Sequence, residues 1–126
     1  MIFFIAALSL RSILYLEVIM EIKFSKINEH KIIEVSGEVD LYNVSDLKKA
    51  LFSLTDGEHQ SVIVDMKGVN YMDSSGIGAL VAGQKKMKSH NGKFGLMNLH
   101  DDVLNILKLA TLDKFFTIYD SEDNLV

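Results

Sequence analysis

Two adjacent serines stand where the sequence changes from a strand pattern to a helix pattern. Asp73-Ser74-Ser75-Gly76 follows an apolar run that ends near Met66 and precedes a second apolar run at 79–82. The first backbone N–H groups of a helix are unpaired and carry partial positive charge, so an Asp or Ser side chain placed there can cap the helix. The same position favours a phosphate group. The segment therefore predicts a helix cap, a serine that another enzyme phosphorylates, or both.

Catalytic roles for these serines need partners that the sequence does not supply. Gly76, Gly78 and Gly83 suggest a nucleotide loop, but the dinucleotide fingerprint requires Gly or Ala where Val81 stands, and the Gly-Lys-Ser/Thr of a P-loop is missing. Neither serine lies in a Gly-x-Ser-x-Gly elbow, and a nucleophilic serine requires a positioned base. We expect the glycines to let a helix approach the sheet closely. A hydrolase would need a distant histidine, so we predict that the chain is not an enzyme.

Composition argues against several further classes of function. The 126 residues are enough for one domain, and 48% hydrophobic with 24% charged residues is ordinary for a globular protein. A formal net charge of −4 argues against a general nucleic-acid binder. The chain has no cysteine, so it has no disulfide and no thiolate chemistry. His30, His59, His90 and His100 show no ligand spacing, so we predict no metal and no cofactor.

The first twenty residues differ in character from the rest of the chain. Met1 to Met20 is strongly apolar, but Arg11 and Glu17 interrupt it, and each is costly at the centre of a membrane span. The basic start and the cleavage site of a signal peptide are both missing. We therefore expect residues 1–19 to be an apolar leader that comes from a start codon assigned too early, and residues 20–126 to form the domain. A genuine membrane-associated or helical extension is the alternative.

Strand patterns recur five times after Met20. They cover, in chain order, residues 22–27, 31–36, 61–66, 93–98 and 115–119. The first two should form a hairpin through the turn at 28–30, and Gly37 to Asp40 should end the second. The third is apolar almost throughout, which is typical of a central strand covered on both faces.

Three longer segments have apolar residues at helical spacing. They cover about 44–54, 75–90 and 103–110. We expect Asn43 to cap the first, the serine segment the second, and Asp101 or Asp102 the third, with one more short helix in the tail. Two strands followed by repeated strand–helix units predict a single α/β domain. Its mixed β-sheet should have four to five strands, accompanied by three to five helices.

Three segments of this pattern resemble the STAS family, and within it the bacterial anti-sigma-factor antagonists. The longest, Val62 to Gly78, resembles the family's central strand and its Asp-Ser-Ser-Gly-Leu/Ile-Gly signature. Val35 to Asp40 resembles the Gly-Glu-Leu/Ile-Asp turn after the second strand, and Leu96 to Leu112 resembles the late strand and helix. The resemblance covers about Met20 to Asn124, and the leader has no counterpart. Two common leucines are replaced, by Val39 and Ile77.

The resemblance implies a cytoplasmic, non-enzymatic protein that switches partners. Its unphosphorylated form would bind an anti-sigma factor, often itself a serine kinase, and free the sigma factor. Phosphorylation of Ser74 would switch this binding off, and a serine phosphatase would restore it. Asp40, Asp73, Ser75 and Gly76 would support the phosphosite and the partner interface.

Two related roles stay open within the same family. The chain could be a STAS scaffold of a stress-signalling complex or the cytoplasmic STAS subunit of a lipid transporter. A real membrane leader would favour the transporter role. Otherwise the resemblance implies no contact with a membrane and no direct contact with nucleic acid.

Overall fold

Five strands form one mixed sheet in the part of the chain that the computed structural model describes, residues 20–57 and 60–125. The strands are β1 (Glu21–Ile27), β2 (His30–Val39), β3 (Ser61–Met72), β4 (Lys93–Met97) and β5 (Thr117–Tyr119). They lie in sequence order across the sheet, with β1 antiparallel to β2 and every other pair parallel. The predicted hairpin and mixed sheet are confirmed. The predicted leader, residues 1–19, lies outside the described residues.

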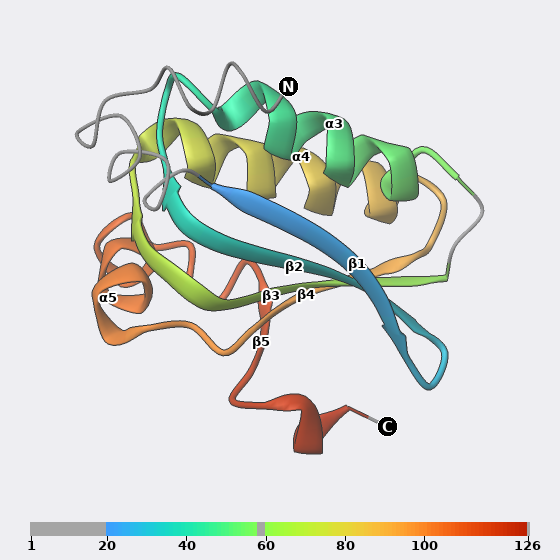
Figure 1. Ribbon diagram of the computed structural model, residues 1–126. Coiled ribbons are helices and arrows are strands. Elements are labelled where there is room, and N and C mark those ends of the chain that lie inside the picture. Colours follow the sequence, from blue (N-terminus) through green and yellow to red (C-terminus); the bar gives the residue numbers. More distant parts are fainter. Residues whose placement is uncertain (1–19, 58–59, 126) are drawn as a thin grey trace, which may run out of the picture.

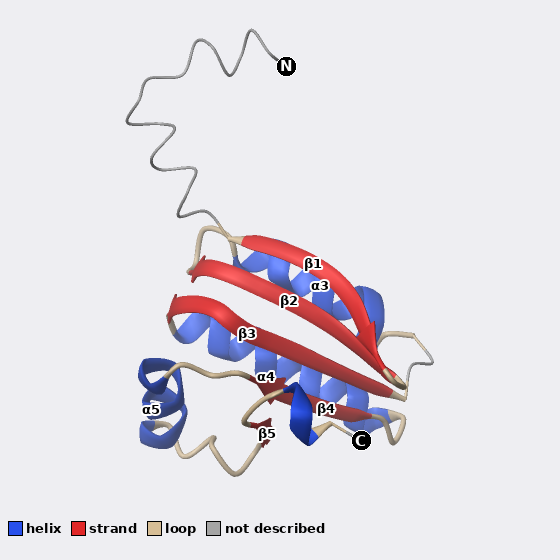
Figure 2. Cartoon of the chain, turned by 60° about the horizontal axis from the view of Figure 1, so that its bottom comes forward, coloured by secondary structure: helices blue, strands red, loops and turns tan. Residues whose placement is uncertain are grey.

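Two long helices cover one face of this sheet. The helices within the described residues are α3 (Val44–Thr55), α4 (Ser74–Ser89), α5 (Asp101–Leu109) and the short 3-10 helix η1 (Glu122–Asn124). α3 and α4 lie side by side over the sheet, and α5 lies at its margin beside β3 (Figure 1). η1 lies on the side of the opposite face, near the C-terminus, and its own residues are exposed (Figure 2). Within the described part of the chain, no helix has the length and the apolar character that crossing a membrane requires.

The main core lies between the sheet and the two long helices. Val62, Val64 and Met66 of β3 point into it and are almost completely buried. Burying one such side chain contributes about 1.5–3 kcal/mol to folding. Ile63 points to the opposite face, where the C-terminal segment covers it in a smaller cluster with Leu125. The predicted cover on both faces is therefore confirmed for the first half of β3.

β2 and β3 are both longer than predicted. The prediction ended them early because a bulge interrupts the regular alternation of side chains between the two faces of the sheet. The register between the two strands shifts between Glu34 and Ser36 and again between Gly37 and Glu38. On β3, Met66 and Val69 both face the core although they are three residues apart, which regular alternation forbids. The bulge adds one residue to β3 and breaks the alternating pattern, so the pattern of apolar residues did not predict the second half of this strand. Both strands therefore continue to the edge of the sheet where the two serines lie.

Among the predictions for the later elements of the chain, two need correction and one is confirmed. β5 begins only at Thr117, because Phe115 and Phe116 turn and stack edge to face at 5.1 Å between ring centroids. Neither aspartate caps α5: the cap position is His100, and both aspartates lie in the first turn. The short C-terminal helix predicted for the tail is present as η1.

Candidate functional site

The carboxyl ends of β2 and β3 bring two loops together at one edge of the sheet. β2 ends at Val39 and leads through residues 40–43 into α3, and β3 ends at Met72 and leads through Asp73 into α4 (Figure 1). The two loops are joined through their backbones, since the Asp73 N–H donates to the carbonyl oxygen of Val39 at 3.1 Å. Parallel neighbours always end at the same edge, and polar side chains there can converge. This edge carries every site residue that the sequence predicted.

Asp73 is the cap of α4. Its Oδ1 accepts from the backbone N–H of Ser75 at 2.9 Å, from that of Gly76 at 3.3 Å, and from the Ser75 hydroxyl at 2.5 Å. A carboxylate in this position satisfies N–H groups that the helix leaves unpaired and interacts favourably with the helix dipole. The prediction that this segment caps the helix is confirmed. The helix begins at Ser74, one residue earlier than predicted, because the aspartate rather than a serine is the cap.

The same carboxylate reaches across to the other loop. Its Oδ2 accepts from the backbone N–H of Leu41 at 3.2 Å. Hydrogen bonding, led by the Ser75 hydroxyl, holds the pKa of Asp73 below its ordinary value of 3.8. Partial burial acts in the opposite direction, and the N–H groups of Gly76, Ser75 and Leu41 lower the pKa further. Asp73 is therefore ionised at neutral pH and links the start of α4 to the loop before α3.

Asp40 organises that second loop. Its Oδ1 accepts from the backbone N–H groups of Tyr42 at 2.9 Å and Asn43 at 3.1 Å, which is an Asx-type turn. Asn43 is the N-cap residue of α3, as predicted, but its side chain makes no capping hydrogen bond to the helix. Its amide instead ties down the strand end, accepting from the Asp40 N–H at 3.0 Å and donating to the Glu38 carbonyl at 2.8 Å. The loop is thus held by hydrogen bonds at each of its residues.

The two serines of the motif have different environments. Ser75 is half-buried and its hydroxyl is engaged by Asp73. Ser74 is exposed, and no hydrogen bond of its hydroxyl is found within the described residues. A hydroxyl that is exposed and uncommitted can enter the active site of another enzyme without first breaking a contact. The geometry therefore favours Ser74 over Ser75 as a site of modification.

Gly76 is required by close packing at the first turn of α4. A Cβ at this residue would lie 2.5 Å from Cγ of Met72 and 2.9 Å from Cγ1 of Val39. Gly83 also faces the sheet, where a Cβ would meet the Phe94 ring at 3.0 Å. Gly78 does not, since nothing lies within 4 Å of its Cβ position. The predicted role of close approach is confirmed for Gly76 and Gly83 and is wrong for Gly78.

Two apolar residues beside the motif were missed from the sequence. Leu41 is 71% exposed and Tyr42 is 93% exposed, although both are large and hydrophobic. Tyr71, two residues before Asp73, is 50% exposed. The available signal was a Leu-Tyr pair placed between Asp40 and Asn43, two residues that favour turns and therefore put their neighbours on the surface.

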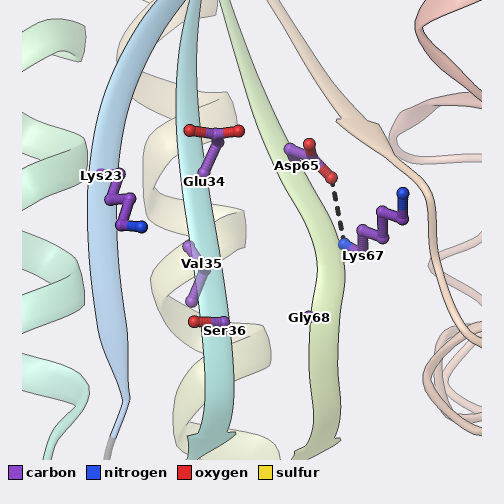
Figure 3. A pocket seen from close by; sticks show the side chains of 7 residues that line it. All are labelled: Lys23, Glu34, Val35, Ser36, Asp65, Lys67 and Gly68. Carbon is purple, nitrogen blue, oxygen red and sulfur yellow. Dashed lines mark hydrogen bonds between the residues drawn. The ribbon is translucent and has the colours of Figure 1, made fainter.

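A hollow of about 310 Å³ on the other face of the sheet is separate from this site. Glu34 of β2 and Asp65 of β3 lie side by side at its centre, flanked by Lys23 and Lys67 (Figure 3). Asp65 Oδ1 accepts from the Lys67 N–H and from the Asn98 amide, both at 3.0 Å. The two carboxylates and two ammonium groups that line this hollow are typical of a sheet face that is turned to water. Among the described residues, no group of three or more His, Asp or Glu is placed to hold a metal ion.

Comparison with known proteins assigns the chain to a family. The family model described as the STAS domain matches residues 21–125. The chain is 30% identical over 94 residues to the anti-sigma-B factor antagonist of Bacillus subtilis (strain 168). The matched region covers 74% of this chain and 85% of that protein.

Solved structures share the fold. An anti-sigma factor antagonist from Mycobacterium paratuberculosis has a TM-score of 0.77 at 23% identity, covering 84% of this chain and 90% of that one. The phosphorylated form of the Bacillus cell fate determinant SpoIIAA has a TM-score of 0.64 at 18% identity, covering 82% of this chain and 95% of that one.

Proposed function

The chain belongs to the STAS domain family, and from this we propose that it is an anti-sigma-factor antagonist with Ser74 as its switch. The unphosphorylated chain binds an anti-sigma factor and thereby frees a sigma factor. A serine kinase, in many such systems the anti-sigma factor itself, transfers a phosphoryl group to Ser74, and a serine phosphatase removes it. The observation that carries the proposal is the exposed, uncommitted hydroxyl of Ser74 at the N-terminus of α4.

The chain acts as a substrate and a binding partner in this cycle. The Ser74 oxygen attacks the γ-phosphorus of ATP, the bond to the β-phosphate oxygen breaks, ADP leaves, and the hydroxyl proton passes to a base of the kinase. Water reverses the modification in the phosphatase and releases inorganic phosphate. Both reactions draw their catalytic groups from the other enzyme. The role of this chain is to hold Ser74 in a fixed position, which the Asp73 cap and the neighbouring loop provide.

The electrostatics of the site agree with a phosphate that switches binding off. Phosphorylation adds about −1.5 to −2 charges at neutral pH. The new charge stands beside the ionised Asp73, and the segments 32–47 and 68–84 contain no Lys or Arg to neutralise it. In the free protein, water and the N-terminus of α4 solvate the phosphate. In a complex the phosphate would lose water without gaining a cation from these segments of the chain, so the affinity should fall.

The proposal is tested by phosphorylation of variants with purified cognate kinase and labelled ATP. Wild type and Ser75→Ala should both be labelled at one site, and Ser74→Ala should not be labelled. Ser75→Ala is the matched control, because it removes the neighbouring hydroxyl and leaves the exposed one in place. Label that persists in Ser74→Ala and disappears in Ser75→Ala would refute the assignment of Ser74.

A further inference from the structure

Two large apolar side chains project into solvent next to the switch. Leu41 and Tyr42 are consecutive, are 71% and 93% exposed, and lie in the loop that the Asp73 carboxylate holds through the Leu41 N–H. We propose that this Leu41–Tyr42 pair anchors the protein partner of the unphosphorylated chain, and that the partner covers it with an uncharged apolar recess. The inference rests on the proposed function and adds to it the residues that supply affinity and the chemistry of the surface they meet.

Exposure alone does not make this argument, because single exposed apolar residues are common on protein surfaces. The pair is distinguished by how firmly its backbone is held. The Leu41 N–H donates to Asp73 at 3.2 Å, and the Tyr42 N–H donates to Asp40 at 2.9 Å. The Asn43 amide, bonded to Asp40 N–H and to the Glu38 carbonyl, closes the loop behind them. A preorganised anchor loses little conformational entropy on binding, and tyrosine is enriched among the residues that dominate interfaces.

The charges around the pair define the partner's surface. Four acids lie in the adjoining segments: Glu38 at the end of β2, Asp40 in the loop, Asp46 in the first turn of α3 and Asp73 at the cap of α4. The segments 37–47 and 68–84 contain no Lys or Arg. An acidic partner would be repelled by this surface in every state. A basic partner would bind more tightly once Ser74 carried a phosphate, which is the opposite of a switch that releases. An uncharged apolar surface accepts the anchors and penalises a phosphate that must lose its water.

The test measures affinity between the unphosphorylated full chain and its purified cognate anti-sigma factor by titration calorimetry. Tyr42→Ala and Leu41→Ala should each weaken binding by at least about tenfold, because each removes a large apolar side chain that the partner covers. Tyr42→Phe should bind within about twofold of wild type, since it keeps the ring and loses only the hydroxyl. Phe24→Ala is the control, because Phe24 is a 56% exposed aromatic on the edge strand β1, next to the end of α3. It should also bind within about twofold of wild type.

Two further arms examine the partner's chemistry and the alternative occupants. Affinity should change less than about threefold between about 50 and 500 mM salt, whereas contact with a basic surface would be strongly screened. Sedimentation of the chain alone should give the same mass for wild type and Tyr42→Ala. A wild-type dimer that Tyr42→Ala dissociates would mean that a second copy covers the pair, and would overturn the proposal.

The outcomes separate this inference from the function on which it rests. If Ser74→Asp releases the partner while Tyr42→Ala and Leu41→Ala bind like wild type, the anchors are wrong and the switch stands. A strongly salt-dependent affinity would contradict the apolar recess. If the wild-type chain does not bind the anti-sigma factor at all, the proposed function falls and the inference falls with it. Thermal unfolding of each variant shows whether a loss of binding comes from loss of fold; the exposed position of both residues predicts unchanged melting.

Discussion

Asp73 connects three parts of the site through a single carboxylate. One oxygen caps α4 and engages Ser75, and the other holds the Leu41 N–H of the neighbouring loop. Ser74, directly after the cap, is left exposed by this arrangement. The aspartate therefore acts as a positioning residue: it fixes both the hydroxyl that the kinase would meet and the loop beside it.

The lowered pKa of Asp73 predicts a pH-dependent contribution to stability. Because its folded-state pKa lies below the ordinary value of 3.8, the ionised carboxylate stabilises the fold above that value. The contribution is lost as the pH falls through the folded-state pKa. Asp73→Ala should therefore lower the free energy of unfolding by about 1 kcal/mol at neutral pH, the usual effect of losing a cap. The difference from wild type should shrink toward zero well below pH 3.8.

Urea unfolding at neutral and acid pH measures this difference. Asp120→Ala is the matched control, because Asp120 is an exposed aspartate that caps no helix. It should change the free energy of unfolding by less than about 0.5 kcal/mol at either pH. A destabilisation by Asp73→Ala that stays the same at both pH values would show that the charge of the carboxylate is not what stabilises the cap.

Local sequence was enough to locate this site, but it did not show which residue caps α4 or which contacts that residue makes. The change from strand to helix pattern predicted a cap at 73–75, and Asp and Ser are both good caps, so the choice of Asp73 was open. The bond between Asp73 and the Leu41 N–H joins residues 32 apart in the chain. Contacts of that kind depend on which strands are neighbours, so no local pattern predicts them. The exposed Leu41–Tyr42 pair differs in this respect, because the turn-forming Asp40 and Asn43 on either side of it gave a local signal.

At the level of elements, α4 is seated on the sheet through its first turn. Gly76 faces Met72 and Val39 at distances that leave no room for a methyl group, whereas Gly78, two residues later, faces open space. This contrast follows from the helix period, since residues two apart lie on different faces. Ser74 belongs to the same first turn of α4, which the close contact at Gly76 holds against the sheet.

Alanine substitutions at Gly76 and Gly78 should change the free energy of unfolding in opposite directions. Gly76→Ala should lower the free energy of unfolding by about 1–3 kcal/mol, the range for overpacking a core contact. Gly78→Ala, its matched control, should raise it by about 0.5–1 kcal/mol, because alanine is the better helix former and meets no atom there. Chemical denaturation of both variants checks the pair. Equal effects of the same sign would contradict the described seating of α4.

The elements themselves were predictable where periodicity is regular. The hairpin, the three helices and the start of β3 follow from apolar spacing, which is set by burial on one face. The second half of β3 was missed because the bulge near Gly68 breaks the alternation; a Cβ at Gly68 would lie 2.5 Å from Cβ of Ser36. The cap position of α3 was predicted correctly as Asn43, although its side chain makes no capping hydrogen bond. The cap of α5 was misassigned because several polar residues stand before the helix and local sequence does not decide among them.

At the scale of the whole molecule, Ser74, the proposed switch residue, lies at the rim of the fold and the core lies elsewhere. The main core is enclosed between the sheet and the layer of α3 and α4 (Figure 1). Ser74 and the Leu41–Tyr42 pair are exposed, just beyond the carboxyl ends of β3 and β2. A charge added to an exposed rim changes what the surface can bind without unpacking the interior. This separation suits a STAS domain that exchanges partners while its fold persists.

The central claim is tested most directly by the affinity of the Ser74-phosphorylated chain for the cognate anti-sigma factor, compared with that of the unmodified chain. Phosphorylation should weaken binding by about 100-fold or more, which corresponds to about 2.7 kcal/mol, while thermal unfolding of the two forms stays the same. The same affinity for both forms, with the modification confirmed at Ser74, would contradict the account.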